Sequence, residues 1–177
     1  MTTSEGQSGS GGVVIVGGGL AAARTAEQLR RAEYTGAITI VSDENHLPYD
    51  RPPLSKEVLR AETDDVTLKP AEFYADNDIT VLLGNGARSV DTVAKSLTLA
   101  DGTTLGYDEL VIATGLVPKR IPSFPDLPGI HVLRSLDESR ALRSEAREAA
   151  RAVVVGAGFI GCEVAASLRT LDVDVTL

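Results

Sequence analysis

The sequence of 177 residues contains little cysteine and little histidine: one cysteine, Cys162, and two histidines, His46 and His131. A single cysteine excludes an intrachain disulfide and a cluster of thiolate metal ligands. The two histidines lie far apart in the sequence, without the short spacing of metal ligands, and are expected on the surface or in loops. The sequence therefore predicts no metal site.

Basic residues are also scarce, with 17 against 25 acidic ones and a net charge of −8. Nucleic-acid binding needs a basic face, so we expect no nucleic-acid partner. No apolar run approaches the roughly 20 residues that cross a membrane, so no membrane partner is expected. Residues 1–12 are rich in Gly, Ser and Thr and lack the features of a signal peptide, which predicts a flexible tail on a cytoplasmic protein.

What the sequence does have is a glycine-rich turn between an apolar run, Val13–Val16, and a helical pattern, Leu20–Arg31. Gly17, Gly19 and Ala22 fill the three small-residue positions of a dinucleotide fingerprint. The glycines allow a tight turn and a close approach to a pyrophosphate, and the helix N-terminus attracts the phosphates. A glycine-rich turn in an ordinary α/β protein is the alternative.

A second copy of the pattern strengthens this interpretation. The valine run 153–155 is followed by Gly156, Gly158 and Gly161 at the fingerprint spacing. Two fingerprints predict two bound dinucleotides; the alternative is one bound nucleotide, with the other fingerprint a decoy. The fold class predicted is α/β, with two Rossmann-like units.

An acidic pair follows the second predicted strand, Ala37–Val41. Asp43 and Glu44 stand where the fingerprint places the acid that binds the adenosine ribose. Asp43 is nearer the strand end and is the preferred candidate. A solvated acidic loop is the alternative.

A stiff loop comes next, since Pro52 and Pro53 restrict the backbone. Ser55 is expected to cap a short helix through Arg60. The loop would hold Arg51 and Lys56 beside a bound dinucleotide, where they could contact phosphate and cofactor ring. The alternative is that both side chains simply lie on the surface.

The order of the remaining segments predicts two domains, 13–116 and 117–177, with a proline-rich linker at 118–128. The sequence predicts a helix at Pro70–Asn77, strands at Ile79–Leu83 and Leu110–Gly115, an antiparallel meander within Ser89–Leu105, and a capping box at Ser135–Glu138 that opens a helix to about Ala150. The second unit stops within its second strand, so the chain is expected to be a fragment. The acid that selects NAD over NADP would then lie beyond Leu177.

Four motifs together resemble the ferredoxin reductase family of FAD-dependent NAD(P)H oxidoreductases, to which apoptosis-inducing factor is also similar. They are Gly17-x-Gly19-x-x-Ala22, Tyr49-x-Arg51-Pro52-Pro53-Leu54-Ser55-Lys56, Ala113-Thr114-Gly115 and Gly156-x-Gly158-x-Ile160-Gly161-x-Glu163. The proline motif is the specific part, and the resemblance covers all but the tail. Ala22 replaces the commoner third glycine, which the motif tolerates.

The resemblance implies that the first fingerprint binds FAD and the second binds NAD(P)H, with NADH favoured. The implied FAD contacts are Gly17, Gly19, Leu20, Ala21, Ala22, Asp43, Glu44, Arg51, Lys56, Arg88, Ala113, Thr114, Gly115 and Arg134. The implied nicotinamide dinucleotide contacts are Gly156, Gly158, Ile160, Gly161 and Glu163. Lys56 and Glu163 are expected to be catalytic, as an ion pair beside the flavin. Glu163 is expected on the first turn of its helix, where the dipole favours an acid.

Related disulfide reductases carry a cysteine pair in the region that Arg51–Lys56 occupies here. Without that pair, electrons are expected to pass from flavin directly to an outside acceptor, a ferredoxin-type iron–sulfur protein. The alternatives are a small-molecule reductase, a redox-responsive interaction protein like apoptosis-inducing factor, and a nucleotide-binding module without catalysis.

Overall fold

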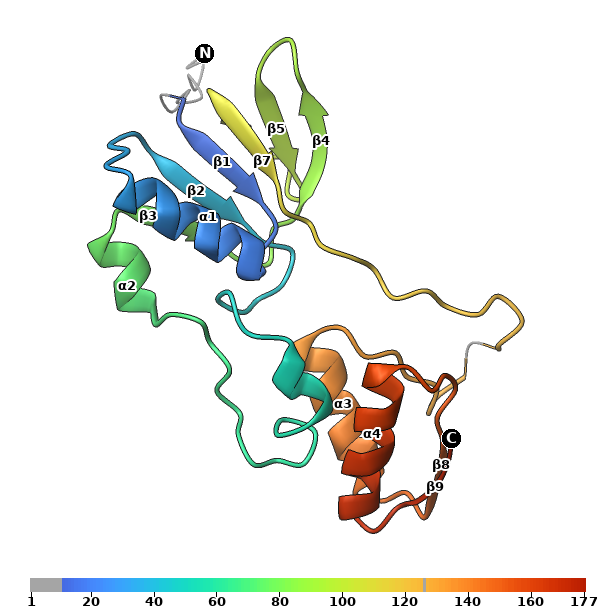
Figure 1. The fold of residues 1–177 in the computed structure, drawn as a ribbon. Coiled ribbons are helices and arrows are strands. Elements are labelled where there is room, and N and C mark those ends of the chain that lie inside the picture. Colours follow the sequence, from blue (N-terminus) through green and yellow to red (C-terminus); the bar gives the residue numbers. More distant parts are fainter. Residues whose placement is uncertain (1–10, 126) are drawn as a thin grey trace, which may run out of the picture. The chain divides into compact units, whose positions relative to one another are not determined.

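The computed structural model describes residues 11–125 and 127–177, so the predicted tail lies outside the described residues except for Gly11 and Gly12. The chain divides into two compact units (Figure 1). The first unit comprises the residues up to Tyr49 together with Thr67–Gly115, and the second comprises Asp50–Val66 and Leu116–Leu177. The predicted first domain, 13–116, therefore differs from the first compact unit in the segment 50–66.

The first unit is built on a parallel sheet of four strands in the order β3-β2-β1-β7. The strands are β1 (Val13–Val16), β2 (Ile38–Val41), β3 (Ile79–Leu82) and β7 (Glu109–Ile112). Val13 pairs with Ile38 on one side and with Glu109 on the other, so β1 is an inner strand. This arrangement confirms the predicted α/β class, because parallel strands need crossovers on the sheet faces.

Both faces of β1 are buried, which explains its unbroken apolar sequence. Val13 and Ile15 pack in one core with α1 (Leu20–Arg31) and α2 (Ala71–Asp76). Val14 and Val16 pack in a second core with the meander strand β5 (Ser96–Leu99). Figure 1 shows α1 and the meander on opposite sides of the sheet.

The predicted meander is present as three antiparallel strands in the order β4-β5-β6. β4 spans Ala87–Asp91 and β6 spans Thr104–Gly106. Leu97 and Leu99 of β5 are fully buried against the sheet, whereas β4 is exposed from Arg88 to Asp91. The pairing of β4 with β5 shifts register between Ala87 and Ser89.

The second unit contains a 3₁₀ turn, η1 (Pro52–Ser55), followed by α3 (Leu136–Ala146), β8 (Arg151–Val153), α4 (Phe159–Thr170) and β9 (Asp174–Thr176). β8 and β9 pair in parallel. Leu59 is fully buried in one core with Ala146, Val164 and Leu168. Through Leu59, the segment 50–66 packs in the core of this unit.

Two predicted helix limits are wrong. Ser55 does not cap a helix through Arg60: it is the last residue of η1, and Lys56 leaves the helical region at φ −126° and ψ −102°. Two adjacent prolines favour a short, tight turn rather than a longer helix. The helix opened by Ser135 ends at Ala146, not near Ala150, while its capping box with Glu138 is confirmed.

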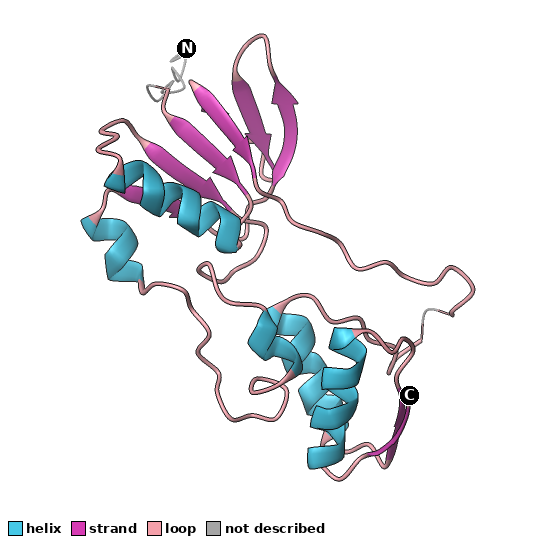
Figure 2. Ribbon diagram, in the orientation of Figure 1, coloured by secondary structure: helices cyan, strands magenta, loops and turns pink. Residues whose placement is uncertain are grey.

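The segment 113–134 contains turns, and its described residues form no helix or strand (Figure 2), as the cluster of prolines predicted. Across 11–125 and 127–177, none of the helices has the length and apolarity needed to span a bilayer.

Candidate nucleotide-binding site

The first glycine turn joins the end of β1 to α1. Gly17 has a φ of +120°, and a Cβ there would collide with the Ala113 carbonyl, so the backbone requires glycine. The Ala113 amide donates to the Val16 carbonyl over 2.7 Å. The predicted residues Ala113, Thr114 and Gly115 thus follow β7 directly beside the turn, at the carboxyl edge of the parallel sheet where α/β folds bind ligands.

Gly19 is the N-cap of α1 and adopts extended backbone geometry. In the described part of the chain, no side chain caps this helix, no acid lies in its first turn, and a Cβ built on Gly19 meets no atom within 4 Å. The open space and the free N–H groups fit a phosphate. Ala22 is fully buried, so it allows the close packing predicted, whereas Leu20 and Ala21 are exposed at the turn.

The two predicted ribose acids follow β2 and differ in their surroundings. Glu44 accepts a hydrogen bond of 2.6 Å from the hydroxyl of Tyr49. Asp43 is exposed and lies against the backbone of Gly86, just before the meander. The side chain of Asp43 is therefore exposed at the end of β2, and its role as the ribose ligand stays a prediction.

Arg88 is exposed on β4 at the point where the strand pairing shifts between Ala87 and Ser89. An irregularity of this kind re-aims a side chain. The exposed residues Arg88 and Asp43 belong to the same unit.

The second glycine turn joins β8 to α4 and has the same form as the first. Gly156 has a φ of +112°, and Gly158 is an extended N-cap. Within the described chain, α4 has no side-chain cap and no first-turn acid, and the space around Gly158 is open. Gly161 lies against the Gly156 carbonyl, and Ile160 is exposed. This turn also fits a phosphate.

Arg51 and Arg134, predicted as cofactor contacts, lie together in the second unit. One guanidinium nitrogen of Arg51 donates to the Arg134 carbonyl over 2.5 Å. The Arg134 amide in turn donates to Glu138 over 2.7 Å. The capping box of α3 therefore fixes the backbone from which the Arg134 side chain extends.

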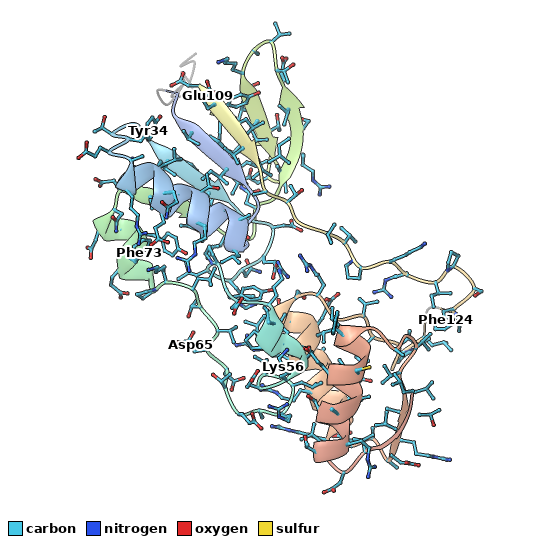
Figure 3. All side chains as sticks on the ribbon, in the orientation of Figure 1. Tyr34, Lys56, Asp65, Phe73, Glu109 and Phe124 are labelled. Carbon is cyan, nitrogen blue, oxygen red and sulfur yellow. The ribbon has the colours of Figure 1, made fainter. Side chains whose placement is uncertain are left out.

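The predicted ion pair between Lys56 and Glu163 is confirmed: the ammonium lies 2.8 Å from Oε2 of the carboxylate. Figure 3 labels Lys56 on the turn that faces α4. The Ser55 hydroxyl donates to the same carboxylate oxygen over 2.5 Å. Hydrogen bonds from Lys56 and Ser55 lower the pKa of Glu163 below its usual value of 4.5, so the carboxylate is charged at neutral pH.

The predicted position of Glu163 on the first turn of its helix is wrong. α4 begins at Phe159, which places Glu163 in the second turn. The helix dipole acts mainly within the first turn, so the charge of Glu163 is stabilised by its two donors instead. Sequence reasoning missed Ser55 as a site residue; its place directly before Lys56 in the proline motif was the available signal.

A cavity of about 1000 Å³ lies within the second unit, beside the second glycine turn. Gly156 and Ile160 line it, together with Lys119 and Arg151. His131, expected on the surface or in a loop, lies in a loop that also lines the cavity. Its Nε2 is 3.0 Å from a carboxylate oxygen of Glu145. The cavity is large enough for part of a nucleotide and carries cations.

Comparison with known proteins identifies a family and relatives of this chain. Residues 11–177 match the family described as pyridine nucleotide-disulphide oxidoreductase. Rhodocoxin reductase from Rhodococcus erythropolis is 40% identical over 168 residues, which are 93% of this chain and 39% of the relative. The ferredoxin–NAD(+) reductase component of the p-cumate 2,3-dioxygenase system from Pseudomonas putida is 42% identical over 93% of this chain and 42% of the relative.

Among solved structures, the ferredoxin reductase for the CYP199A2 system from Rhodopseudomonas palustris has a TM-score of 0.87 at 40% identity, covering 94% of this chain and 42% of that one. The chain belongs to the pyridine nucleotide-disulphide oxidoreductase family. It spans about two fifths of the length of these relatives. Despite the family's name, this chain holds a single cysteine, Cys162, which is exposed.

Proposed function

We propose that this chain is the nucleotide-binding part of an FAD-dependent oxidoreductase that passes electrons from NAD(P)H to a ferredoxin-type iron–sulfur protein. One observation carries the proposal: two glycine turns share the same backbone form, with φ of +120° at Gly17 and +112° at Gly156. Each leads into a helix whose N-terminus is open in the described residues. Two such turns suit two dinucleotides.

FAD is assigned to the first turn. Gly17, Gly19, Leu20, Ala21 and Ala22 would surround its pyrophosphate, and Asp43 would bind its ribose. The further contacts proposed are Glu44, Arg88, Ala113, Thr114 and Gly115 from the first unit, and Arg51, Lys56 and Arg134 from the second. The support within the first unit is that the residues 113–115 and Asp43 stand at the same sheet edge as the turn.

NAD(P)H is assigned to the second turn, with Gly156, Gly158, Ile160 and Gly161 at its phosphates. A bound flavin would supply the chemistry of accepting two electrons as hydride and releasing them singly. Lys56 would stabilise the negative charge that develops on the flavin, and Glu163 would hold the ammonium in place. The 2.8 Å contact between Lys56 and Glu163 supports this pairing of roles.

The acceptor proposed is a ferredoxin-type iron–sulfur protein. Relatives named as ferredoxin–NAD(+) reductase components act in p-cumate and benzene dioxygenase systems, and a structural neighbour is a complex of putidaredoxin reductase with putidaredoxin. One NADH gives two electrons, so two one-electron acceptors are reduced per turnover. The single cysteine supports direct transfer from the flavin, since this chain cannot form an internal disulfide relay.

The full-length protein tests the proposal. It should purify yellow with bound FAD and should oxidise NADH rapidly only when a ferredoxin is supplied. Fast turnover with a small molecule alone would indicate a small-molecule reductase, and flavin binding with slow turnover would indicate a redox-responsive interaction protein. A colourless protein would contradict the flavoenzyme assignment.

Two finer features complete the proposal. NADH is the preferred donor, supported by relatives named for NAD(+), and kcat/KM should be at least about tenfold higher for NADH than for NADPH. Comparable values would contradict this preference.

The proposed location is the cytoplasm, which fractionation of the source cells tests.

A further inference from the structure

Two buried serine hydroxyls hold the backbone directly before Lys56. The Ser139 hydroxyl, from α3, donates to the Leu54 carbonyl over 2.7 Å. The Ser167 hydroxyl, from α4, donates to the Ser55 carbonyl over 2.7 Å. Ser139 is 0% exposed and Ser167 is 1% exposed, so water does not compete for these bonds. Two helices thus each bind one of the two carbonyls that precede the lysine.

The carbonyls need these partners because the turn ends abruptly. The amides of Lys56 and Val58 both donate to the Pro53 carbonyl. Because Lys56 leaves the helical region, the helical hydrogen-bond series that would take up the carbonyls of Leu54 and Ser55 does not continue. A buried carbonyl without a partner is costly, so the two serines complete a backbone that the proline sequence leaves open.

The same face of α4 holds the side chains of the turn. Glu163 and Ser167 are four residues apart on α4 and therefore neighbours on its surface. Glu163 accepts from Ser55 and Lys56, while Ser167 donates to the Ser55 carbonyl. Ser167 also accepts from Arg60 over 3.2 Å. The Ser55 carbonyl and the side chains of Ser55 and Lys56 are therefore all bound to one face of α4.

We propose that Ser139 and Ser167 are positioning residues that fix the Lys56 ammonium for flavin reduction. This inference rests on the proposed function. A lysine side chain has many rotamers, and its ion pair with Glu163 fixes only the far end. The two serine bonds fix the near end, so the ammonium has one location. A displacement of about 1 Å in a charged group can cost on the order of 10² in rate.

Thr170 provides a matched control on the same helix. Its hydroxyl donates to the Ser167 carbonyl over 2.7 Å, within α4 itself. Thr170→Val therefore removes one hydroxyl bond from α4 without removing any bond to the turn. A purely structural role for Ser167 predicts that Ser167→Ala and Thr170→Val behave alike in every measurement other than stability.

The experiment compares Ser139→Ala, Ser167→Ala, Ser167→Thr and Thr170→Val in the full-length protein. One readout is independent of turnover: the pKa of the Glu163 carboxyl, from carbon-13 NMR of labelled glutamate, assigned with Glu163→Gln. The second is the rate of flavin reduction by NADH under anaerobic conditions, at matched flavin content.

We expect both alanine variants to raise the pKa of Glu163 toward its usual value and to slow flavin reduction about tenfold. Ser167→Thr, which keeps the hydroxyl, should stay within about twofold of the parent, as should Thr170→Val. Alanine variants that match Thr170→Val in both readouts would overturn the inference, and so would a changed pKa with an unchanged rate. If the parent binds no flavin or its flavin is not reduced by NADH, the proposed function fails, while the pKa comparison still tests whether the serines position the pair.

Discussion

The two glycine turns are alike in backbone and unlike in surroundings. Gly17 and Gly156 share a positive φ, and Gly19 and Gly158 are both open, extended N-caps. Yet Val14, three residues before Gly17, is 4% exposed in a four-stranded sheet, whereas Val153, three residues before Gly156, is 74% exposed in a two-stranded one. The local turn therefore forms from glycine, strand end and helix start, without depending on how deeply its strand is buried.

The difference between the turns predicts unequal sensitivity to added side chains. Gly17→Ala places a Cβ against the Ala113 carbonyl and strains the backbone, whereas Gly156→Ala strains the backbone in open space. Gly17→Ala should lower the free energy of unfolding by about 4 kcal/mol, and Gly156→Ala by about 1–2 kcal/mol. Urea denaturation of the full-length variants measures both. Equal losses would mean that the Ala113 contact does not distinguish the turns.

The next largest effect concerns two lysine–carboxylate pairs, one in each unit. Lys56 pairs with Glu163 at 2.8 Å, and Lys69 lies 3.7 Å from Glu27, with similar exposure of the two lysines. Lys56→Met should slow flavin reduction by NADH on the order of 10²-fold, because one preorganised charge is lost. Lys69→Met should change this rate less than about twofold. The comparison fails if both variants slow the reaction alike at full flavin occupancy.

The smallest predicted effect is a pH dependence of stability from Glu27. A hydrogen bond from Arg24, together with the charges of Lys69 and Arg31, lowers the pKa of Glu27 below its usual 4.5, against the opposing effect of burial. A lowered pKa in the folded state stabilises the fold above pH 4.5, and this contribution is lost as the pH falls through the folded-state value. Glu27→Gln should therefore denature earlier than the parent at pH 7.

Urea denaturation midpoints of the parent and Glu27→Gln, measured from pH 7 to pH 3, check this prediction. The two midpoints should converge as the pH falls below 4.5. A difference that stays constant over the whole range would mean that the charge of Glu27 does not contribute to stability.

Sequence patterns predicted the elements that local residues determine. β1 and α1 have the predicted limits because an apolar run, a glycine turn and an alanine-rich helix follow one another without a break. The capping box of Ser135 and Glu138 is likewise a matter of four consecutive residues.

Other features depend on packing that the sequence does not display. The pattern around Leu59 does not show which core this residue joins. The sequence therefore predicts the domain of segment 50–66 only from its position in the chain, whereas its contacts place it in the second unit. Serine is a common helix-capping residue, so the sequence favours a cap at Ser55. Its hydroxyl donates to Glu163 instead, which depends on the position of α4. The ion pair itself was predictable from two motifs, but its supporting serines were not.

The central claim is that the first glycine turn binds FAD and the second binds the nicotinamide dinucleotide. Gly19→Val and Gly158→Val test it in the full-length protein, since both positions are extended and open among the described residues, so that a valine fits the fold but not a pyrophosphate. The measurement is flavin content by visible absorbance, followed by flavin reduction with NADH. The account predicts that Gly19→Val loses most of its flavin, and that Gly158→Val keeps its flavin but needs a much higher NADH concentration for reduction. Full flavin content in Gly19→Val, or loss of flavin in Gly158→Val with normal NADH binding, would contradict the assignment.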